Sequence, residues 1–422
     1  MGAAFNDEYV IVRRGKHEGD PSEITVNCPD KVGLGCDFSR TVFEFGLSVV
    51  KGDFSTDGRW CFVVLWVVPR VSASTVRWPL LKQRLEHACP SAVDQFLLPC
   101  PPPPVLTSKN VFLLQVCSSD RTGLLHGVAK KLWEMELTIH KVKVSTSPDD
   151  KAVNLFFVTD NRNELFWKKR VEEVCDQVRE LLGDTCSRCD LIQAGPECGG
   201  LGCAPLPLQV ANDLFTEVSV PLVTEKDDGE GGDLTCLDGA HTVVTLDNSI
   251  SPVHSLLQVT RKNRKGLLYD CLRTLKDMKL QVAHGRVITE NGISMISVFV
   301  LRADGQKITD VEEKKRLCIC MHNEVEHPLR VAVVTRGPDT ELHVATPIEI
   351  CGRGRPRVLY DVTLALKQLD ICIFKADIGR HVVANRHWEI YRFLLVDRAE
   401  VSWSSSKISS LLAERVRHIL MG

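Results

Sequence analysis

At 422 residues the chain is too long for one small domain, and its 44% hydrophobic and 25% charged residues are typical of a globular protein rather than a disordered one. The 52 Lys plus Arg against 54 Asp plus Glu give a formal charge of −2, which leaves no basic excess to favour nucleic acid or an anionic membrane as a partner. The longest strongly apolar stretch, Cys61 to Val68, is too short to cross a bilayer, and no apolar signal core stands near the beginning of the sequence. The 17 scattered cysteines fit a reducing compartment, so we expect a cytoplasmic or nuclear protein.

A short motif recurs along the chain, each time between an apolar strand and the apolar stripe of a helix. Its three clear copies are Asp30-Lys-Val-Gly33-Leu34, Asp120-Arg-Thr-Gly123-Leu124 and Asn263-Arg-Lys-Gly266-Leu267. A weaker fourth copy is anchored by Leu359-Tyr-Asp361 and has Arg357 in place of the glycine. The chain is therefore predicted to contain four repeats of one unit.

In the first repeat the predicted elements are a strand at Ile24–Val26, a helix beginning at Leu34, a hairpin around Asp57-Gly58, a helix through Leu81 and Leu85, and a last strand near Val93–Leu98. A proline-rich segment then predicts a stiff spacer. The second repeat begins with the strand Val111–Val116 and ends with a strand at Cys189–Ala194. The following glycine-rich segment, with many carboxylates and few apolar residues, predicts a flexible linker.

The third repeat begins with a strand at Leu256–Val259, forms its hairpin at Asn291-Gly292 and is predicted to close with the strand Leu329–Thr335. The fourth begins with a less regular strand at Ile348–Ile350 and ends at its second helix, so it is one strand short. We expect the apolar segment Tyr9–Val12 to fill this vacant sheet edge, because uncovered edge strands invite aggregation.

The shared order is β-α-β-β-α-β, which predicts an α+β fold of four ferredoxin-like units, each an antiparallel four-stranded sheet with two helices on one face. We expect the units to pack side by side, the first with the second and the third with the fourth. The predicted boundaries are 1–21 for an N-terminal segment, 22–99 and 110–195 for the first two units around a spacer at 100–109, 196–252 for the linker, and 253–338 and 339–422 for the last two units.

Four such units with Asp-x-x-Gly-Leu at the first strand-to-helix turn resemble the ACT domain, a small-molecule-binding regulatory module. The tandem arrangement is similar to the plant ACT-domain-repeat proteins, and three segments resemble the branch numbered nine and ten: Gly52–Gly58, Arg336–Leu342 and Ala376–His381. The resemblance covers roughly residues 20–420. It implies a regulatory protein whose loop packs against a neighbouring ACT unit, with an amino acid ligand between the two.

The loop residues suit such a ligand. A helix N-terminus leaves N–H groups that favour a carboxylate, and glycine lets a ligand approach the backbone. The polar residue of each loop can cap the helix or contact an ammonium group. We therefore predict an amino acid site at Asp30, Gly33, Leu34, Asp120, Gly123, Leu124, Asn263, Gly266 and Leu267; the alternative is that these residues only build a tight turn. The fourth loop is discounted because of Arg357 and Pro356.

No nucleophile elbow, zinc-protease helix, P-loop or dinucleotide fingerprint is found, so we expect neither an enzyme nor a cofactor. Cys186, Cys189, Cys198 and Cys203 begin with a C-x-x-C spacing, but ordinary thiols are favoured over zinc or a redox pair. Two functions remain: a sensor that binds a free amino acid and signals to an unidentified protein partner, and a ligand-independent ACT scaffold for protein–protein interaction. Self-association through ACT units is a further expectation.

Overall fold

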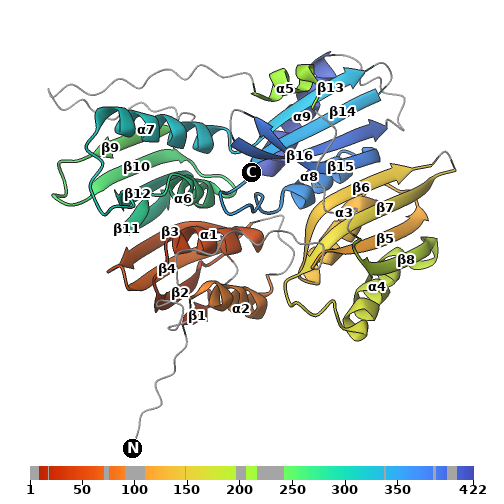
Figure 1. Ribbon diagram of the computed structural model, residues 1–422, viewed down its shortest axis with the longest axis horizontal. Helices are drawn as coiled ribbons and strands as arrows, with labels where there is room; N and C mark the ends of the chain where they lie inside the picture. Colours follow the sequence, from red (N-terminus) through yellow and green to blue (C-terminus); the bar gives the residue numbers. More distant parts are fainter. Residues whose placement is uncertain are drawn as a thin grey trace, which may run out of the picture. The chain divides into compact units, whose positions relative to one another are not determined.

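The computed structural model (Figure 1) describes residues 9–17, 19–70, 76–90, 110–147, 149–195, 206–215, 242–336, 339–383, 386–396 and 406–422. They form two compact units, and each unit combines two segments that are far apart in the sequence. Unit 1 comprises Met1–Cys100 with Val218–Pro328, and unit 2 comprises Pro101–Glu217 with Leu329–Gly422. Each unit contains two repeats joined into one antiparallel eight-stranded sheet, which confirms the predicted α+β fold.

The partners within each unit differ from the prediction. Unit 1 joins the first and third repeats through β3 (Leu47–Thr56) and β11 (Gln281–Glu290). Unit 2 joins the second and fourth repeats through β15 (Cys372–Val383) and β6 (Leu137–Thr146). The expectation that neighbours in sequence pair is therefore wrong. Every repeat presents the same edge, the strand after its first helix, so the repeat pattern alone does not say which edges meet.

The remaining elements of unit 1 follow one order in both repeats. The first repeat has β1 (Val10–Arg13), β2 (Ser22–Pro29), α1 (Leu34–Glu44), β4 (Trp60–Pro69) and α2 (Trp78–Ala88). The third repeat has β9 (Val243–Asp247), β10 (Ser255–Lys262), α6 (Leu267–Asp277), β12 (Ile293–Leu301) and α7 (Val311–Glu326). The sheet order is β1-β2-β4-β3-β11-β12-β10-β9.

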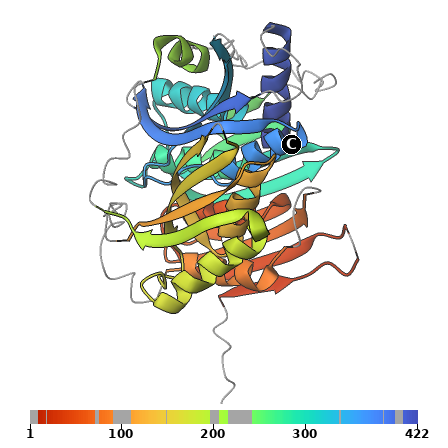
Figure 2. The same ribbon diagram turned by 90° about the vertical axis from the view of Figure 1, so that its right-hand side faces the viewer.

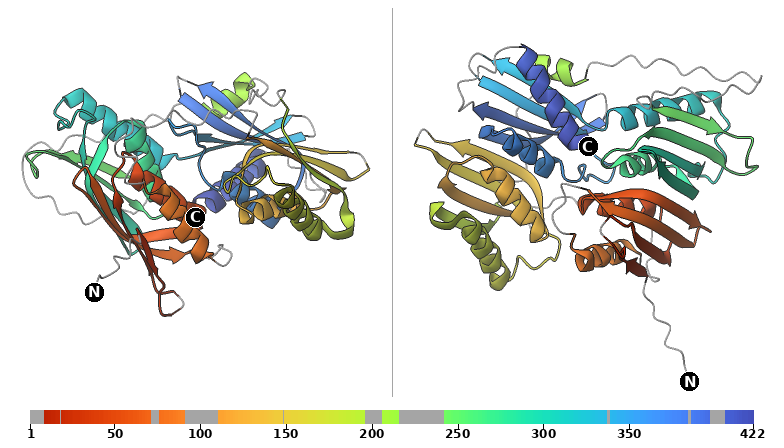
Figure 3. Two further views of the ribbon diagram at one scale, coloured as in Figure 1. Left: turned by 60° about the horizontal axis from the view of Figure 1, so that its bottom comes forward. Right: turned by 180° about the vertical axis from the view of Figure 1, so that it is seen from behind.

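Unit 2 is built in the same way, with sheet order β13-β14-β16-β15-β6-β7-β5-β8. The second repeat has β5 (Phe112–Ser119), α3 (Leu124–Glu134), β7 (Lys151–Asp160), α4 (Lys168–Leu182), the 3-10 turn Gly183–Thr185 and β8 (Cys186–Gln193). The fourth has β13 (Arg330–Arg336), β14 (Asp339–Pro347), α8 (Val358–Gln368), β16 (Arg386–Val396) and α9 (Ser406–Met421). Figure 2 shows α4 lying against β8, and Figure 3 shows α9 crossing the strands of its repeat.

The edge strands correct several predictions. Only the second repeat has its edge strand, β8, at its C-terminal end, as predicted. In the other three repeats the edge strands β1, β9 and β13 come first and pair with the strand that follows. Leu329–Thr335 therefore opens the fourth repeat instead of closing the third, so the fourth repeat is not a strand short. Tyr9–Val12 likewise belongs to the edge of the first repeat, where β1 pairs with β2, and not to the fourth. Ile348–Ile350 lies beyond β14 rather than in a strand.

The reason is geometric. In this sheet order the edge strand of a repeat is antiparallel to the strand that leads into the first helix. A strand that precedes this one and forms a hairpin with it therefore occupies the same place as a strand at the C-terminal end of the repeat. A short hairpin also closes with less loss of chain entropy than a strand returning from a distant helix. The predicted last strand Val93–Leu98 lies outside the described residues.

The predicted linker at 196–252 also contains structure. The helix α5 (Leu208–Phe215) packs Val210 and Leu214 against β13, β14 and β16, on the face of the fourth-repeat sheet opposite its own helices. Arg330 holds the end of this helix: its Nη1 donates to the carbonyl oxygen of Leu214 at 3.1 Å, and its guanidinium lies over the rings of Phe215 and Trp388. Part of the linker is therefore a docked amphipathic helix, which at eight residues was too short to be recognised from its apolar pattern.

The predicted helical stripes are confirmed. Their leading residues are buried in one core per unit, which fills the space between the sheet and the helices on one of its faces (Figure 3). Within each unit, the first helices of the two repeats contact each other, α1 with α6 and α3 with α8. This contact brings the loop at the start of each helix close to the end of the helix in the partner repeat.

Candidate functional site

The predicted loops share one backbone conformation. Gly33, Gly123 and Gly266 precede α1, α3 and α6 with φ of 82°, 77° and 70°, in the left-handed region that favours glycine. Arg357 takes the same conformation before α8, with φ of 65°. The fourth loop therefore keeps its shape without a glycine, at the expense of backbone strain.

A backbone hydrogen bond also holds three of these loops in place. The N–H of the polar residue that opens each loop donates to a carbonyl in the hairpin turn of its own repeat: Asp30 to Arg59 at 2.8 Å, Asp120 to Asp150 at 2.7 Å and Asn263 to Gly292 at 2.7 Å. The loop thus forms where the end of the first strand meets the hairpin turn, as the predicted order of elements requires.

Two predicted roles change. Leu34, Leu124 and Leu267 are at most 6% exposed and begin the buried helical stripe, so core packing explains them. Asp30 does not cap α1: its carboxylate accepts from the Lys31 N–H at 2.7 Å and from the Thr56 hydroxyl at 2.5 Å. The side chain therefore ties the loop to the hairpin, because the left-handed glycine turns the chain between Asp30 and the helix.

A lysine from the partner repeat covers the loop glycine at two of the four loops. In unit 1 the stem of Lys276, near the end of α6, lies where a Cβ on Gly33 would be, 2.8 Å away. In unit 2 the stem of Lys367, at the matching position of α8, lies 2.7 Å from the corresponding point at Gly123. The other two loops meet an aromatic residue at the same helical position, Phe43 near the loop of the third repeat and Trp133 beside Arg357.

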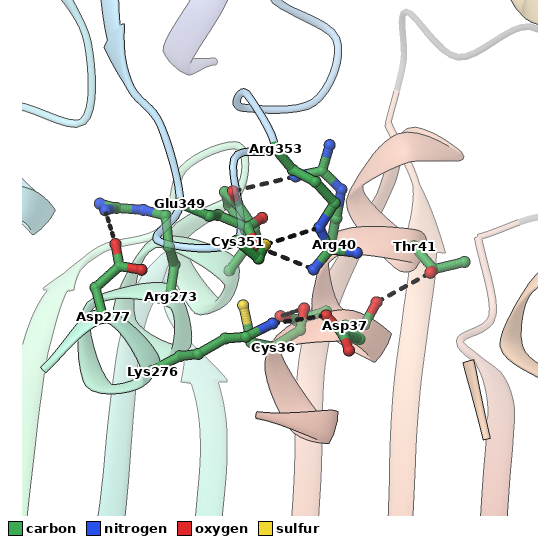
Figure 4. A network of polar contacts seen from close by, with 12 residues as sticks. Cys36, Asp37, Arg40, Thr41, Arg273, Lys276, Asp277, Glu349, Cys351 and Arg353 are labelled. Carbon is green, nitrogen blue, oxygen red and sulfur yellow. Dashed lines mark hydrogen bonds and ion pairs between the residues drawn. The ribbon is translucent and has the colours of Figure 1, made fainter. Parts of the chain in front are cut away.

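The two lysines differ in charge pairing. The ammonium of Lys276 lies 3.0 Å from the Asp37 carboxylate, which is 8% exposed and begins α1 (Figure 4). The position of Asp37 in α3 is occupied by Gly127, and Lys367, on the exposed side of α8, makes no ion pair in the part of the chain that the structure describes. A ligand carboxylate would therefore compete with a carboxylate for Lys276 but not for Lys367.

The loop of the second repeat opens onto a pocket at the contact with the fourth, which we call the second-repeat pocket. It is lined by Asp120, Gly123, Asn154, Thr363 and Lys367 among others, and its volume of about 20 Å³ is room for roughly one water molecule. Asn154, on β7, is 1% exposed, and neither its Oδ1 nor its Nδ2 has a hydrogen-bond partner among the described residues.

Two further side chains share this property beside the pocket. The hydroxyls of Ser118, 2% exposed, and Thr146, 8% exposed, find no partner among the residues described. Both lie opposite Ala152, a lining residue, on the strands either side of it. Burying a polar group without a hydrogen bond costs about 1–3 kcal/mol, so these groups call for a hydrogen-bonding guest in the pocket, either a water molecule or a ligand.

A histidine joins the two repeats at this pocket. His126, 6% exposed on α3, has Nδ1 3.2 Å from the Thr363 hydroxyl, which itself donates to the Leu359 carbonyl. Burial, with a smaller contribution from the nearby positive charge of Lys367, lowers the pKa of His126 to about 4. The ring is therefore neutral at pH 7, and its Nδ1–H donates to Thr363.

The loop of the third repeat borders a pocket of about 30 Å³, lined by Asn263, Gly266 and Phe43 among others, but the arginine of this loop and that of the fourth are already paired with carboxylates. Arg264, 4% exposed, is paired with Asp270 at 2.5 Å and donates to the Val325 carbonyl. Arg357 lies over the rings of Trp133 and Tyr360 and 3.6 Å from Asp361. Of the four loops, the second-repeat loop alone combines unpartnered polar groups with a lysine that has no carboxylate partner, within the described residues.

Sequence reasoning missed Lys367, Asn154, Ser118 and Thr146. Lys367 lies in a repeat far along the chain, and the other three resemble ordinary strand residues. The one available signal was Asn154, a polar residue at an inward position of β7. Among the candidate thiols, Cys186 and Cys189 belong to β8, whereas Cys198 and Cys203 lie outside the described residues. No group of three or more metal-ligating side chains is found in the described segments.

Four repeats of this order, joined in pairs with a glycine loop at the helix contact, define a tandem ACT-domain protein. Family models match three segments: the N-terminal model of ACT domain-containing protein ACR10 at residues 12–90, the ACR9-like ACT-like domain at 243–339 and the C-terminal model of ACR9 at 340–422. The chain belongs to the ACR family of ACT domain-containing proteins, in the branch of ACR9 and ACR10.

Curated relatives agree over the whole length. The chain is 43% identical to ACR9 of Arabidopsis thaliana over 420 residues and 42% identical to ACR10 of the same plant over 427, with 99% of each chain covered in both cases. It is 21% identical to ACR6, which covers 89% of this chain and 80% of that protein. The described part of the chain contains no helix long and apolar enough to cross a bilayer.

Proposed function

We propose that the chain is a non-catalytic regulatory protein that binds a free amino acid in the second-repeat pocket and signals its occupancy to a protein partner. The observation that carries this proposal is a group of buried polar side chains, Ser118, Thr146 and Asn154, for which the described residues supply no hydrogen-bond partner at the atoms concerned. The group lies next to the loop of Asp120 and Gly123. Such groups are costly in the free protein, and a polar ligand that hydrogen-bonds to them recovers that free energy.

The charges fit a zwitterion. Lys367 offers an ammonium to the ligand carboxylate, together with N–H groups at the start of α3. The carboxylate of Asp120, in the same pocket, can accept the ligand ammonium. Asn154, with two donors and two acceptor sites, would then face the ligand side chain and favour a polar one.

Binding would also move the contact between repeats. The pocket of about 20 Å³ is smaller than an amino acid, so the stem of Lys367 has to withdraw from Gly123 when a ligand enters. Because the lysine belongs to α8 and the glycine to the second repeat, occupancy shifts the packing of α3 on α8. A partner that prefers one packing over the other would sense the ligand.

The test is a thermal-shift measurement on the full chain with each common amino acid in turn. A specific ligand is expected to raise the melting temperature by mass action. Lys367→Met should abolish the shift, whereas the matched variant Lys276→Met, which removes the lysine already paired with Asp37, should keep it. If no amino acid raises the melting temperature, the sensor hypothesis fails and the alternative, a ligand-independent ACT scaffold, is favoured.

A further inference from the structure

Three cysteines lie in the same region at the end of the sheet in the first repeat, although among the described residues they do not form a group that could hold a metal ion. Cys28 on β2 lies directly opposite Cys61 on β4, and their side chains are 0% and 7% exposed. Cys89 follows the last turn of α2 and is half-buried. It packs against the part of the core that contains Cys28 and Cys61, and its Sγ lies 3.3 Å from the carbonyl oxygen of Leu85. The Cys28 and Cys89 thiols are close enough for a hydrogen bond between them to shift the pKa of both.

Two of these cysteines have counterparts beside the second-repeat pocket. Cys28 stands two residues before Asp30, as Ser118 does before Asp120, and Cys61 faces it as Ala152 faces Ser118. The negative charge of Asp30 contributes to raising the pKa of both Cys28 and Cys61. The first repeat therefore has a thiol where the second has the unpartnered hydroxyl of Ser118, and a second thiol where the second repeat has Ala152.

The three thiols differ in reactivity. Burial raises the pKa of Cys61 to about 12, and the hydrogen bond with Cys89, together with burial, raises the pKa of Cys28. The same hydrogen bond lowers the pKa of Cys89, the most accessible of the three. Oxidation-sensitive cysteines are accessible, form the thiolate readily and lie beside a second thiol that can resolve the product.

We propose that Cys89 is a site of reversible oxidation by hydroperoxides, and that Cys28 resolves the product into an intramolecular disulfide. In the first step the Cys89 thiolate attacks the O–O bond of hydrogen peroxide, forming the sulfenic acid and releasing hydroxide, which takes up a proton to become water. In the second step the Cys28 sulfur attacks the sulfenic sulfur, the S–O bond breaks, the thiol proton leaves with the oxygen, and a second water is released. The two thiols lose two electrons and the peroxide gains them.

Cys61 is the less suitable resolving thiol. The N–H of Asp30 donates to the carbonyl of Arg59, which makes Asp30–Arg59 a hydrogen-bonded pair of the ladder. Two residues along each strand, Cys28 and Cys61 form a pair of the same kind, in which side chains lie farther apart than in the pairs without hydrogen bonds. A disulfide between Cys28 and Cys89 instead ties the end of α2 to the strand that leads into the first loop.

The experiment treats the full chain with a small excess of hydrogen peroxide, blocks free thiols with iodoacetamide and identifies linked tryptic peptides by mass spectrometry without reduction. A peptide pair containing Cys28 and Cys89 should appear, and dithiothreitol should remove it. In Cys28→Ser the sulfenic acid of Cys89 should persist and be trapped by dimedone. In Cys89→Ser, Cys28 should remain reduced.

Unit 2 supplies the matched control. Cys175 on α4 and Cys189 on β8 are also hydrogen-bonded to each other but are 5% and 2% exposed. If accessibility decides, Cys28 and Cys89 should link at least tenfold faster than this buried pair, and Cys175→Ser should leave their rate unchanged. Equal rates for the two pairs, or a disulfide of Cys89 with any cysteine other than Cys28, would overturn the proposal.

Discussion

The loops of the first and second repeats have the same backbone and differ in what surrounds it. Both place a glycine with left-handed φ under a lysine from the partner repeat. In the first repeat that lysine is paired with Asp37 and the inward strand positions carry Cys28 and Cys61. In the second repeat the lysine makes no such pair in the described segments, and polar groups stay without partners.

The difference teaches that repetition preserves a frame while each copy acquires its own chemistry. Strand, loop and helix are set by apolar periodicity and by a left-handed residue, which all four repeats keep. The side chains proposed to contact a ligand lie at a few inward or partner-facing positions, where a substitution does not disturb the strand, loop and helix. A shared motif therefore predicts the loop but not whether the loop binds anything.

Substitution of the loop glycines should separate the two repeats by their loss of stability. Gly33→Ala should destabilise unit 1 by about 2–3 kcal/mol, because a left-handed alanine costs roughly 1–2 kcal/mol and the added methyl group displaces Lys276 from Asp37. Gly123→Ala displaces the unpaired Lys367 and should cost only the backbone strain. Gly58, with φ of 85° and open space around it, is the control for strain alone. Denaturant titration gives the three values, and an equal loss at all three positions would contradict the role of the ion pair.

A second expected effect has the opposite sign. Asn154→Leu should stabilise unit 2 by roughly 1–2 kcal/mol, because it replaces two buried polar atoms, which have no hydrogen-bond partner among the described residues, by an apolar side chain of the same branched shape. It should also remove the amino acid response. Thr346→Val is the matched control, since Thr346 is fully buried with an unpartnered hydroxyl in the fourth repeat, outside the pocket. It should stabilise the protein and keep the response; loss of stability in Asn154→Leu would show that the amide is satisfied in solution.

A third change converts one loop toward the other. Gly127→Asp places a carboxylate in α3 where Asp37 stands in α1, and only the side chain of Leu181 lies within 4 Å of the added Cβ. The new carboxylate should pair with Lys367 and weaken amino acid binding about tenfold, measured by calorimetry with the ligand found in the thermal-shift screen. Gly127→Ala should leave the affinity unchanged and stabilise the helix by up to about 1 kcal/mol. If both variants bind equally well, Lys367 does not hold the ligand carboxylate.

The frame was predictable because its signals are local. The stripe that begins at Leu34, Leu124 and Leu267 repeats at helical spacing, and the hairpin turns at Asp57-Gly58 and Asn291-Gly292 carry residues that such turns require. The edge strands were not predictable in the same way, because a strand at either end of a repeat can occupy the same edge of the sheet. Whether Leu329–Thr335 closes one repeat or opens the next depends on three-dimensional pairing, which the strand pattern does not contain.

The site was predictable only in part, for a related reason. Gly123 is visible in sequence because it needs a particular φ, whereas Lys367 is an ordinary exposed lysine until the second repeat is known to pair with the fourth. Asn154 becomes informative only when its burial and its missing partners are seen together. Residues whose role depends on a distant segment leave no local pattern.

The last expected effect concerns pH and again separates the second repeat from the first. Burial lowers the pKa of His126 and of His140 to about 4, so the folded unit 2 leaves them neutral while the unfolded chain takes up protons near pH 6.5. Their contribution to stability is complete above pH 6.5 and is lost as the pH falls from there toward 4. Hydrogen exchange at pH 7 and pH 5 should therefore show protection falling more in α3 than in α1. The double variant His126→Gln with His140→Gln should reduce this fall, whereas replacing the exposed His87 by Gln should not; an unchanged fall in the double variant would assign the acid sensitivity to carboxylates instead.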